Sequence, residues 1–355
     1  MNEPRGKKPG REPGSGNRLL DPARRGKRLT PIFPLVVLVY AIYPAGLLAS
    51  FAPIVAVSVL IRRFPPLERL FYDDGLFAST VGVLLQSLLA FAPVYLLLWA
   101  WLKFYEKRPF SSLGLKMDLA SVRQHLRGIL VALVMVGSWV VIQAATGHLA
   151  FDGWTNPGPW GLAGFGAILL ASYLGRAFQI GIEEALFRGW VLQAIGGRRG
   201  AVAGILFSSV FFALWHFFQP MTLLGMGRVH DPWPPIVLLN IFLWAVFAAL
   251  WALREGSLWG VIAFHATSLW AYDSVFGFGG SGSPSILDLR LVEPGWLTGG
   301  AEFSGPFEGL PATAAVGAGI LVFLLFSRKK RGSAAGTGSG RDLERRRPVG
   351  VEPEN

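Results

Sequence analysis

Eight apolar segments, separated by polar connectors, constrain the fold of this chain more than any other feature. About 20 consecutive apolar residues cross the hydrocarbon core of a bilayer as an α-helix. Such segments lie at about 33–60, 78–102, 128–145, 164–188, 201–218, 235–253, 258–272 and 311–327. Only 15% of the 355 residues are charged, compared with roughly 25% in soluble domains. The sequence therefore predicts an all-α polytopic membrane helix bundle of about eight transmembrane helices.

Basic residues predict the orientation of this bundle. The connector 103–127 carries six Lys or Arg, whereas the next connector, 146–163, carries none. Because cytoplasmic connectors hold the excess of basic residues, eight spans place both termini in the cytoplasm. The three arginines of 62–77 depart from this rule. Arg outnumbers Lys 25 to 8, which is typical of GC-rich bacterial genomes, so we expect a multi-pass protein of the bacterial inner (plasma) membrane.

The two ends of the chain differ in composition from its apolar middle. Residues 1–30 hold nine Lys or Arg against three acids, and residues 328–355 hold eight against four. Both stretches are rich in Gly, Pro, Ser and Arg, which predicts disordered basic tails on the anionic cytoplasmic surface. Residues 31–327 then form one transmembrane domain. The net charge of +11 indicates the lipid bilayer, and not nucleic acid, as the partner of these tails.

Ionisable side chains interrupt the fourth, fifth and seventh spans. Such groups cost roughly 2.5 to 3.5 kcal/mol each at the centre of a span and usually face the bundle interior. They are Arg176, Glu183, Glu184, Arg188, His216 and His265. Glu184 and Arg188 are four residues apart on a helix and share one face, so they can pair.

Glu183 is expected to face a different neighbour from Glu184, because it lies about 100° further round the helix. It shares a stripe with Arg176 and Gln179. This predicts a structural role for Glu184 and a chemical role for Glu183. The span ends near Arg188, which places Glu183 close to the cytoplasm, with a site that opens inward and with His216 deeper in the membrane.

Two chemistries fit these residues. Two carboxylates and two imidazoles supply either a general base with oxyanion donors, or a three-ligand zinc site with an open water position. The chain has no Cys, which excludes a thiolate metal site and a cysteine nucleophile. In the purely structural alternative, Glu184 and Arg188 cap the end of their span and each histidine bonds a backbone carbonyl. The connector residues His125, His148 and His230 are expected to take no part.

Three segments resemble the motifs of the CAAX-processing and bacteriocin-protection (CPBP, Abi-type) family of intramembrane proteases. EEALFRGW at 183–190 is similar to the motif Glu-Glu-x-x-x-Arg. FFALWHF at 211–217 is similar to the second motif, an aromatic residue four before a histidine. GSLWGVIAFHATSLW at 256–270 resembles the third, a glycine-rich helix start followed by a histidine. With the similar connector RPFSSLGLK at 108–116, the resemblance covers about residues 105–272.

The resemblance implies roles for these side chains. Glu183 would activate a water with help from His216, and Glu184 and Arg188 would hold that arrangement in place. His265 would help to stabilise the oxyanion. The glutamic mechanism requires no cofactor, whereas a metal mechanism would bind zinc through Glu183, His216 and His265.

One position departs from the family pattern. The third motif usually continues His-x-x-x-Asn, and the asparagine donates into the oxyanion hole, but here that position is Leu269. Loss of one such donor costs about 10²- to 10³-fold in rate in a well-studied protease. Ser268 and Asn240 are the nearest candidates to replace it.

The resemblance implies an intramembrane endopeptidase that acts on membrane-embedded or lipid-anchored protein substrates, with C-terminal processing or sorting as its task. The alternative is a catalytically inactive relative that binds a partner or gives bacteriocin immunity, which the change at Leu269 favours. A transporter is a third alternative, and the lack of an internal repeat argues against it. The oligomeric state is not readable from the sequence.

Overall fold

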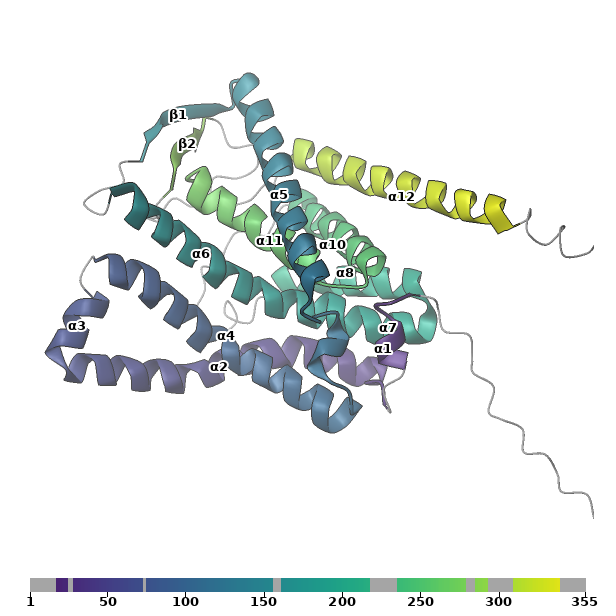
Figure 1. Ribbon diagram of the computed structural model, residues 1–355, viewed down its shortest axis with the longest axis horizontal. Helices are drawn as coiled ribbons and strands as arrows, with labels where there is room; N and C mark the ends of the chain where they lie inside the picture. The colour runs from purple at the N-terminus through teal and green to yellow at the C-terminus, as the bar shows by residue number, and fades with distance from the viewer. Residues whose placement is uncertain are drawn as a thin grey trace, which may run out of the picture.

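Long helices make up most of the chain (Figure 1). The computed structural model describes residues 17–24, 28–72, 75–155, 161–217, 235–278, 285–292 and 309–338. The α-helices are α1 (Asp21–Arg24), α2 (Ile32–Arg63), α3 (Pro65–Tyr72), α4 (Val83–Ala100), α5 (Leu119–Ala145), α6 (Gly161–Glu184), α7 (Leu192–Arg199), α8 (Ala201–Phe217), α10 (Pro235–Glu255), α11 (Trp259–Trp270) and α12 (Leu310–Gly338). Wider π-helical turns are η1 (Ala78–Gly82), η2 (Trp101–Glu106), η5 (Ala185–Val191) and η6 (Ala271–Val275), and η3 (Phe110–Leu113) is a 3₁₀ turn.

Five helices in the described residues are long and apolar enough to cross a membrane. They are Ile32–Arg63, Ala78–Glu106, Leu119–Ala145, Gly161–Arg199 and Ile236–Glu255. Ala201–His216 and Ala312–Leu325 are shorter apolar helices, and α11 has 12 residues. Each of the eight predicted segments therefore coincides with a helix. A multi-pass helical membrane protein is confirmed, while the number of crossings and the cytoplasmic position of the termini stay predictions.

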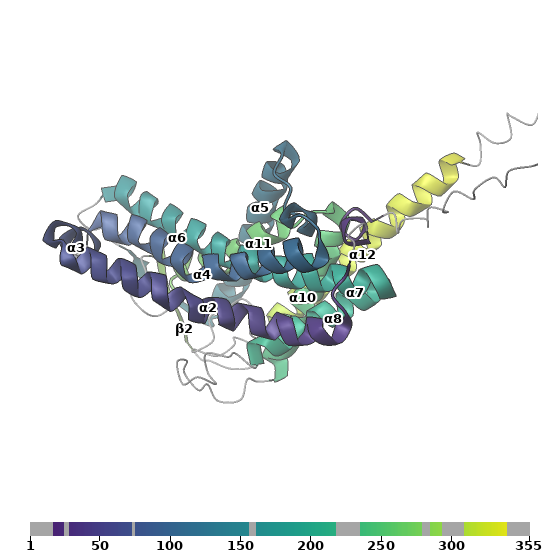
Figure 2. The ribbon, with the colours of Figure 1, turned by 90° about the horizontal axis from the view of Figure 1, so that it is seen from below.

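Helices α2, α4 and α6 run in alternating directions between two ends of the bundle, and α5 crosses them steeply (Figures 1 and 2). One end, here called the strand end, carries the short strands β1 (Leu149–Trp154) and β2 (Leu287–Leu291). The other, here called the turn end, carries the turn at Gly200 between α7 and α8, together with connector 107–118. At the turn end the Leu258 amide donates to the Gly114 carbonyl at 3.0 Å, which joins this connector to the start of α11.

The two strands were not predicted for an all-α fold. β1 pairs antiparallel with β2, with Leu149 opposite Leu291 and an irregularity between Phe151 and Gly153. The strands come from two connectors that both leave the bundle at the strand end. Backbone groups of a connector need hydrogen-bond partners, and pairing satisfies them locally.

The predicted disordered tails are partly ordered. Leu19, Leu20 and Ala23 are buried, and the Asn17 side-chain amide donates to the Leu253 carbonyl at 3.2 Å. Helix α12 continues to Gly338, beyond the predicted boundary of the bundle at 327. Apolar residues at 19 and 20 explain the first difference, because they can pack although the surrounding composition is polar. Residues 1–16 and 339–355 lie outside the described residues.

Small residues allow the central helices to approach closely. A Cβ added at Gly128 of α5 would lie 2.7 Å from the Ala263 Cβ and 2.9 Å from the Phe264 backbone nitrogen of α11. A Cβ added at Gly204 of α8 would lie 2.9 Å from the Gly196 Cα of α7. Such contacts are the usual basis of helix packing in membranes, where lipid tails are as apolar as the helices.

We expect Gly128→Ala to destabilise the bundle by about 1–3 kcal/mol, because the new methyl group would overlap fixed atoms of α11. Gly137→Ala in the same helix is the matched control, since nothing lies within 4 Å of its added Cβ. Thermal unfolding in detergent, followed by intrinsic tryptophan fluorescence, measures both. Equal midpoints for the two variants would contradict the close packing of α5 on α11.

The predicted orientation is open to a labelling test, because the chain contains no Cys. Phe151→Cys places an exposed thiol at the strand end, and Ser111→Cys places one at the turn end. In whole cells, a membrane-impermeant maleimide should label Phe151→Cys directly and Ser111→Cys only after permeabilisation. The reverse pattern would show that the turn end, and with it both termini, lies outside.

Candidate active site

The hairpin of α7 and α8 sets the level of the candidate site in the bundle. The sequence predicted that the helix containing Glu183 ends near Arg188. In the structure this helix begins as α6 and continues through η5 and α7 to Arg199. Glu184 and His216 are therefore equally far along the chain from Gly200, roughly 24 Å at 1.5 Å per residue. The predicted difference in depth disappears. Glu183 also lies far from the turn end, and not close to it.

Glu184 joins two helices through one oxygen. Its Oε1 accepts from the Arg188 Nη1 at 3.2 Å and contacts the His265 Nδ1 at 2.8 Å. All three side chains are buried, and His265 belongs to α11. The predicted pairing of Glu184 with Arg188 is present although η5 is a π-helical turn. π-Helical turns are frequent at functional sites.

Phe212 of α8 lies at the centre of this group. Its ring centroid is 4.6 Å from that of His216 and 6.1 Å from that of His265. The Arg188 guanidinium lies over the same ring, with Cζ 4.0 Å from the centroid. Trp244 of α10 stacks on Phe212, and its ring centroid lies 4.2 Å from that of His265. The structure therefore brings residues of all three motifs together, and the cation–π contact compensates in part for burying the arginine.

Glu183 has a different environment from Glu184. It is buried, and its Oε1 lies 3.4 Å from the Gln179 Nε2 and 3.4 Å from the Tyr43 hydroxyl, both of which are neutral donors. None of the salt bridges among the described residues includes Glu183. The two adjacent carboxylates thus face different neighbours, which agrees with the prediction from helical geometry.

The two imidazoles are held through Nδ1. The His216 Nδ1 lies 2.8 Å from the Phe212 carbonyl, which can only accept, so Nδ1 carries the proton and Nε2 is the acceptor of the neutral ring. The His265 Nδ1 is occupied by Glu184. The Nε2 of His265 can donate to a reacting group only when the ring is doubly protonated.

The other histidines lie apart from this group. His125 contacts the Tyr173 hydroxyl at 2.7 Å, and His148 contacts the Thr146 hydroxyl at 2.8 Å. His230 lies outside the described residues. Among the described residues, neither His125 nor His148 makes a ring contact with Phe212, and their lack of a catalytic role stays a prediction.

The predicted zinc ligands do not fit a metal ion in this arrangement. Among the residues that the structure describes, no three His, Asp or Glu side chains form a group that could hold one. Glu183 bonds Gln179 and Tyr43, and His265 directs Nδ1 to Glu184. We therefore assign no step of the chemistry to a metal.

The two predicted replacements for the family asparagine make hydrogen bonds to groups other than Glu183 in the part of the chain that the structure describes. The Ser268 hydroxyl donates to the Phe264 carbonyl of its own helix at 2.8 Å. The Asn240 side chain donates to the Gly309 carbonyl at 3.2 Å and accepts from Thr313 at 2.5 Å, at the start of α12. Tyr43 of α2 supplies the hydroxyl that contacts Glu183 instead. Tyr43 was not predicted, because nothing in an apolar first span distinguishes it from a packing residue.

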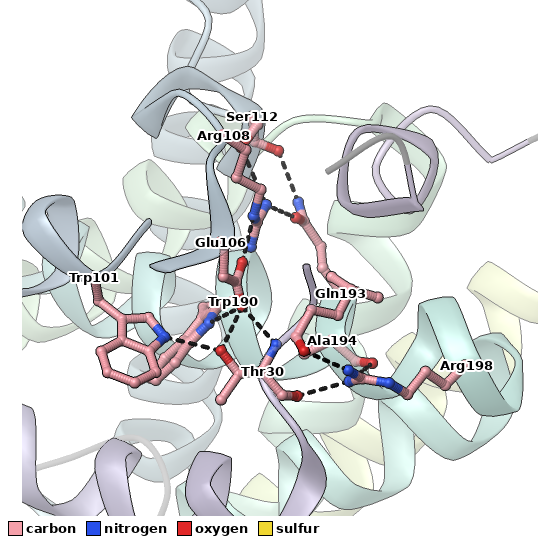
Figure 3. A network of polar contacts seen from close by, with 10 residues as sticks. Thr30, Trp101, Glu106, Arg108, Ser112, Trp190, Gln193, Ala194 and Arg198 are labelled. Carbon is pink, nitrogen blue, oxygen red and sulfur yellow. Dashed lines mark hydrogen bonds and ion pairs between the residues drawn. The ribbon is translucent and has the colours of Figure 1, made fainter. Parts of the chain in front are cut away.

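A third buried carboxylate, Glu106, was not predicted and lies at the turn end (Figure 3). The Glu106 Oε1 accepts from the Thr30 amide, the Thr30 hydroxyl and the Trp190 indole at 3.0, 2.6 and 2.9 Å. Its Oε2 accepts from the Arg108 Nε at 2.5 Å, and Arg108 donates onward to Gln193 at 2.6 Å. Trp190 ends EEALFRGW and Arg108 begins RPFSSLGLK, so this network joins two segments that the family resemblance singled out.

A comparison with protein families agrees with the motifs. The family model described as Type II CAAX prenyl endopeptidase Rce1-like matches residues 164–270, which contain all five candidate site residues. The match is shorter than the predicted 105–272 and excludes the connector 108–116. No curated protein and no solved structure matches the chain. Residues 164–270 thus match a domain of the Rce1-like CAAX protease family, the family that the three motifs predicted.

Proposed function

We propose that this protein is an intramembrane endopeptidase of the glutamic type, in which Glu183 is the general base that activates water. One observation carries the proposal: of two adjacent buried glutamates, Glu184 is committed to Arg188 and His265, whereas the hydrogen-bond partners of Glu183 among the described residues are the neutral donors Tyr43 and Gln179. Glu183 is thus the carboxylate that remains available to accept a proton. A positioned general base typically contributes 10²- to 10⁴-fold to a rate.

The reaction follows from this division of roles. Glu183 takes a proton from water while the water oxygen bonds to the scissile carbonyl carbon, and the carbonyl oxygen becomes an oxyanion. Glu183 then returns the proton to the amide nitrogen as the carbon–nitrogen bond breaks. The His216 Nε2 acceptor orients the water, and His265 donates to the oxyanion through Nε2 in the state in which both of its ring nitrogens carry a proton.

Tyr43 supplies the further oxyanion donor that Leu269 does not. Its hydroxyl lies 3.4 Å from the Glu183 Oε1. Once Glu183 has accepted the proton of water, its oxygen is a weaker acceptor, and the tyrosine proton can turn to the oxyanion that forms beside it. Tyr43 packs against two other rings, with its ring centroid 5.0 Å from that of Trp215 and 6.2 Å from that of Phe91. These contacts hold Tyr43 in place.

The substrates that fit are membrane-embedded or lipid-anchored proteins, cleaved near the C-terminus, in a bacterial inner membrane. A site buried among apolar helices is more accessible to a chain held in the bilayer than to a soluble protein. The matching family is described as a type II CAAX prenyl endopeptidase, and we extend only a broader class of membrane-held substrates to this chain.

An inactive relative that acts by binding or bacteriocin immunity is the second candidate. It is favoured by Leu269 and by the commitment of Ser268 and Asn240 to other partners. Complete absence of cleavage by the wild-type protein across prenylated and unprenylated membrane-anchored substrates would favour this candidate over the protease.

Glu183→Gln should lower kcat by about 10²- to 10⁴-fold with an unchanged melting temperature, since it removes the base but keeps the shape. Glu184→Gln should lower the melting temperature, because it leaves a buried arginine without its carboxylate, at a cost of about 3–5 kcal/mol. The measurements are cleavage of a lipid-anchored reporter peptide and thermal unfolding. A metal chelator should leave wild-type activity unchanged. Full activity in Glu183→Gln would remove Glu183 as the base.

Tyr43→Phe should lower kcat by about 10²- to 10³-fold with little change in KM, as expected for loss of one oxyanion donor. Tyr95→Phe is the matched control, because its hydroxyl donates to the Phe178 carbonyl at 2.8 Å and not to Glu183. Equal kcat values for the two variants would show that Tyr43 has only a packing role. That result would leave the assignment of Glu183 untouched.

A further inference from the structure

Exposure along the helix α6–η5–α7 is asymmetric about Glu183. Every residue from Ile180 to Gly196 is buried, whereas residues 176–179, towards the strand end, are half-buried. Gln179 lies one helical turn from Glu183. In the opposite direction the first residue that is not buried is Gly197, about four turns away. Along this helix, the short route from the surface to Glu183 therefore starts at the strand end.

Polar contacts follow that route without interruption. The Asp273 carboxylate of η6 accepts from the Arg176 Nη2 at 2.7 Å. Arg176 donates through Nη1 to the Gln179 Oε1 at 3.2 Å. The Gln179 Nε2 in turn lies 3.4 Å from the Glu183 Oε1. These side chains link the candidate base to a charged pair near the surface of the bundle.

The pair at the start of this route faces water more readily than lipid. The side chains of Arg176 and Asp273 are 33% and 24% exposed. Charged groups in a span usually face a wet interior, because exposure to hydrocarbon is costly. The lipid-facing side of α6 is recognisable by Leu170 and Leu174, which are 58% and 46% exposed. Leu174 lies about 200° from Arg176 round the helix, so the polar and apolar faces are opposite.

We propose that Asp273, Arg176 and Gln179 form the route by which water reaches Glu183, and that the site is supplied from the strand end of the bundle. The charged Asp273–Arg176 pair keeps the outer part of the route hydrated. Gln179 continues the series of polar groups from Arg176 to Glu183. This replaces the expectation of a site that opens towards the cytoplasmic connectors. The inference rests on Glu183 as the proposed base, and it names the direction from which the hydrolytic water comes.

Cysteine accessibility tests the route without reference to catalysis, because the natural chain has no Cys to interfere. Three single variants of the full chain in lipid nanodiscs are compared: Gln179→Cys on the route, Leu174→Cys on the lipid side, and Ala194→Cys on the buried side towards the turn end. A positively charged methanethiosulfonate reagent modifies a thiol only where water reaches it, and mass spectrometry follows the rate.

Gln179→Cys should react at least about tenfold faster than either control, since thiol reactivity follows hydration and thiolate formation. Adding Arg176→Met to Gln179→Cys should slow its modification several-fold. A rate for Gln179→Cys no faster than that of Leu174→Cys would place residue 179 in lipid and overturn the route. Unchanged modification after Arg176→Met would exclude the ion pair from it. Loss of reporter cleavage in Glu183→Gln tests the proposed function separately.

Discussion

The contact of one buried carboxylate with two nitrogen groups holds the candidate site together. Glu184 accepts from Arg188 within its own helix and contacts His265 on α11, so a single oxygen fixes both the rotation of one helix and its distance from another. Breaking a buried pair by removing one partner typically costs several kcal/mol. The same contact commits Glu184, and this is why we propose its neighbour Glu183 as the general base.

Another buried carboxylate, Glu106, has a similar role at the turn end. Glu106 binds the start of α2 through Thr30, the motif helix through Trp190, and the connector through Arg108. Because Tyr43 lies on α2, the network also fixes the helix that brings a hydroxyl to Glu183. The two carboxylates act at different levels of the bundle, yet both anchor the helix that runs from α6 to α7.

Local sequence patterns predicted much of this arrangement. Apolar length located a helix at each of the eight segments, and the spacing of Glu184 and Arg188 predicted their contact. The predicted helix end near Arg188 was wrong. The apolar segment of the sequence stops at this charged residue, but the folded protein buries the Arg188 guanidinium against the Phe212 ring and the helix continues. The Glu184–His265 contact, the role of Tyr43 and the strands depend on which distant segments meet. No local periodicity encodes such meetings.

Tyr43 lies outside the matched segment 164–270, and this has a consequence for how the family segment can be used. A fragment cut at those boundaries would keep both motif glutamates and both histidines, but it would leave behind the hydroxyl that contacts Glu183 and the Thr30 anchor of Glu106. We therefore do not expect the matched segment to function as a module of its own. In the proposed mechanism its site is completed by the Tyr43 hydroxyl, which a helix outside the segment supplies.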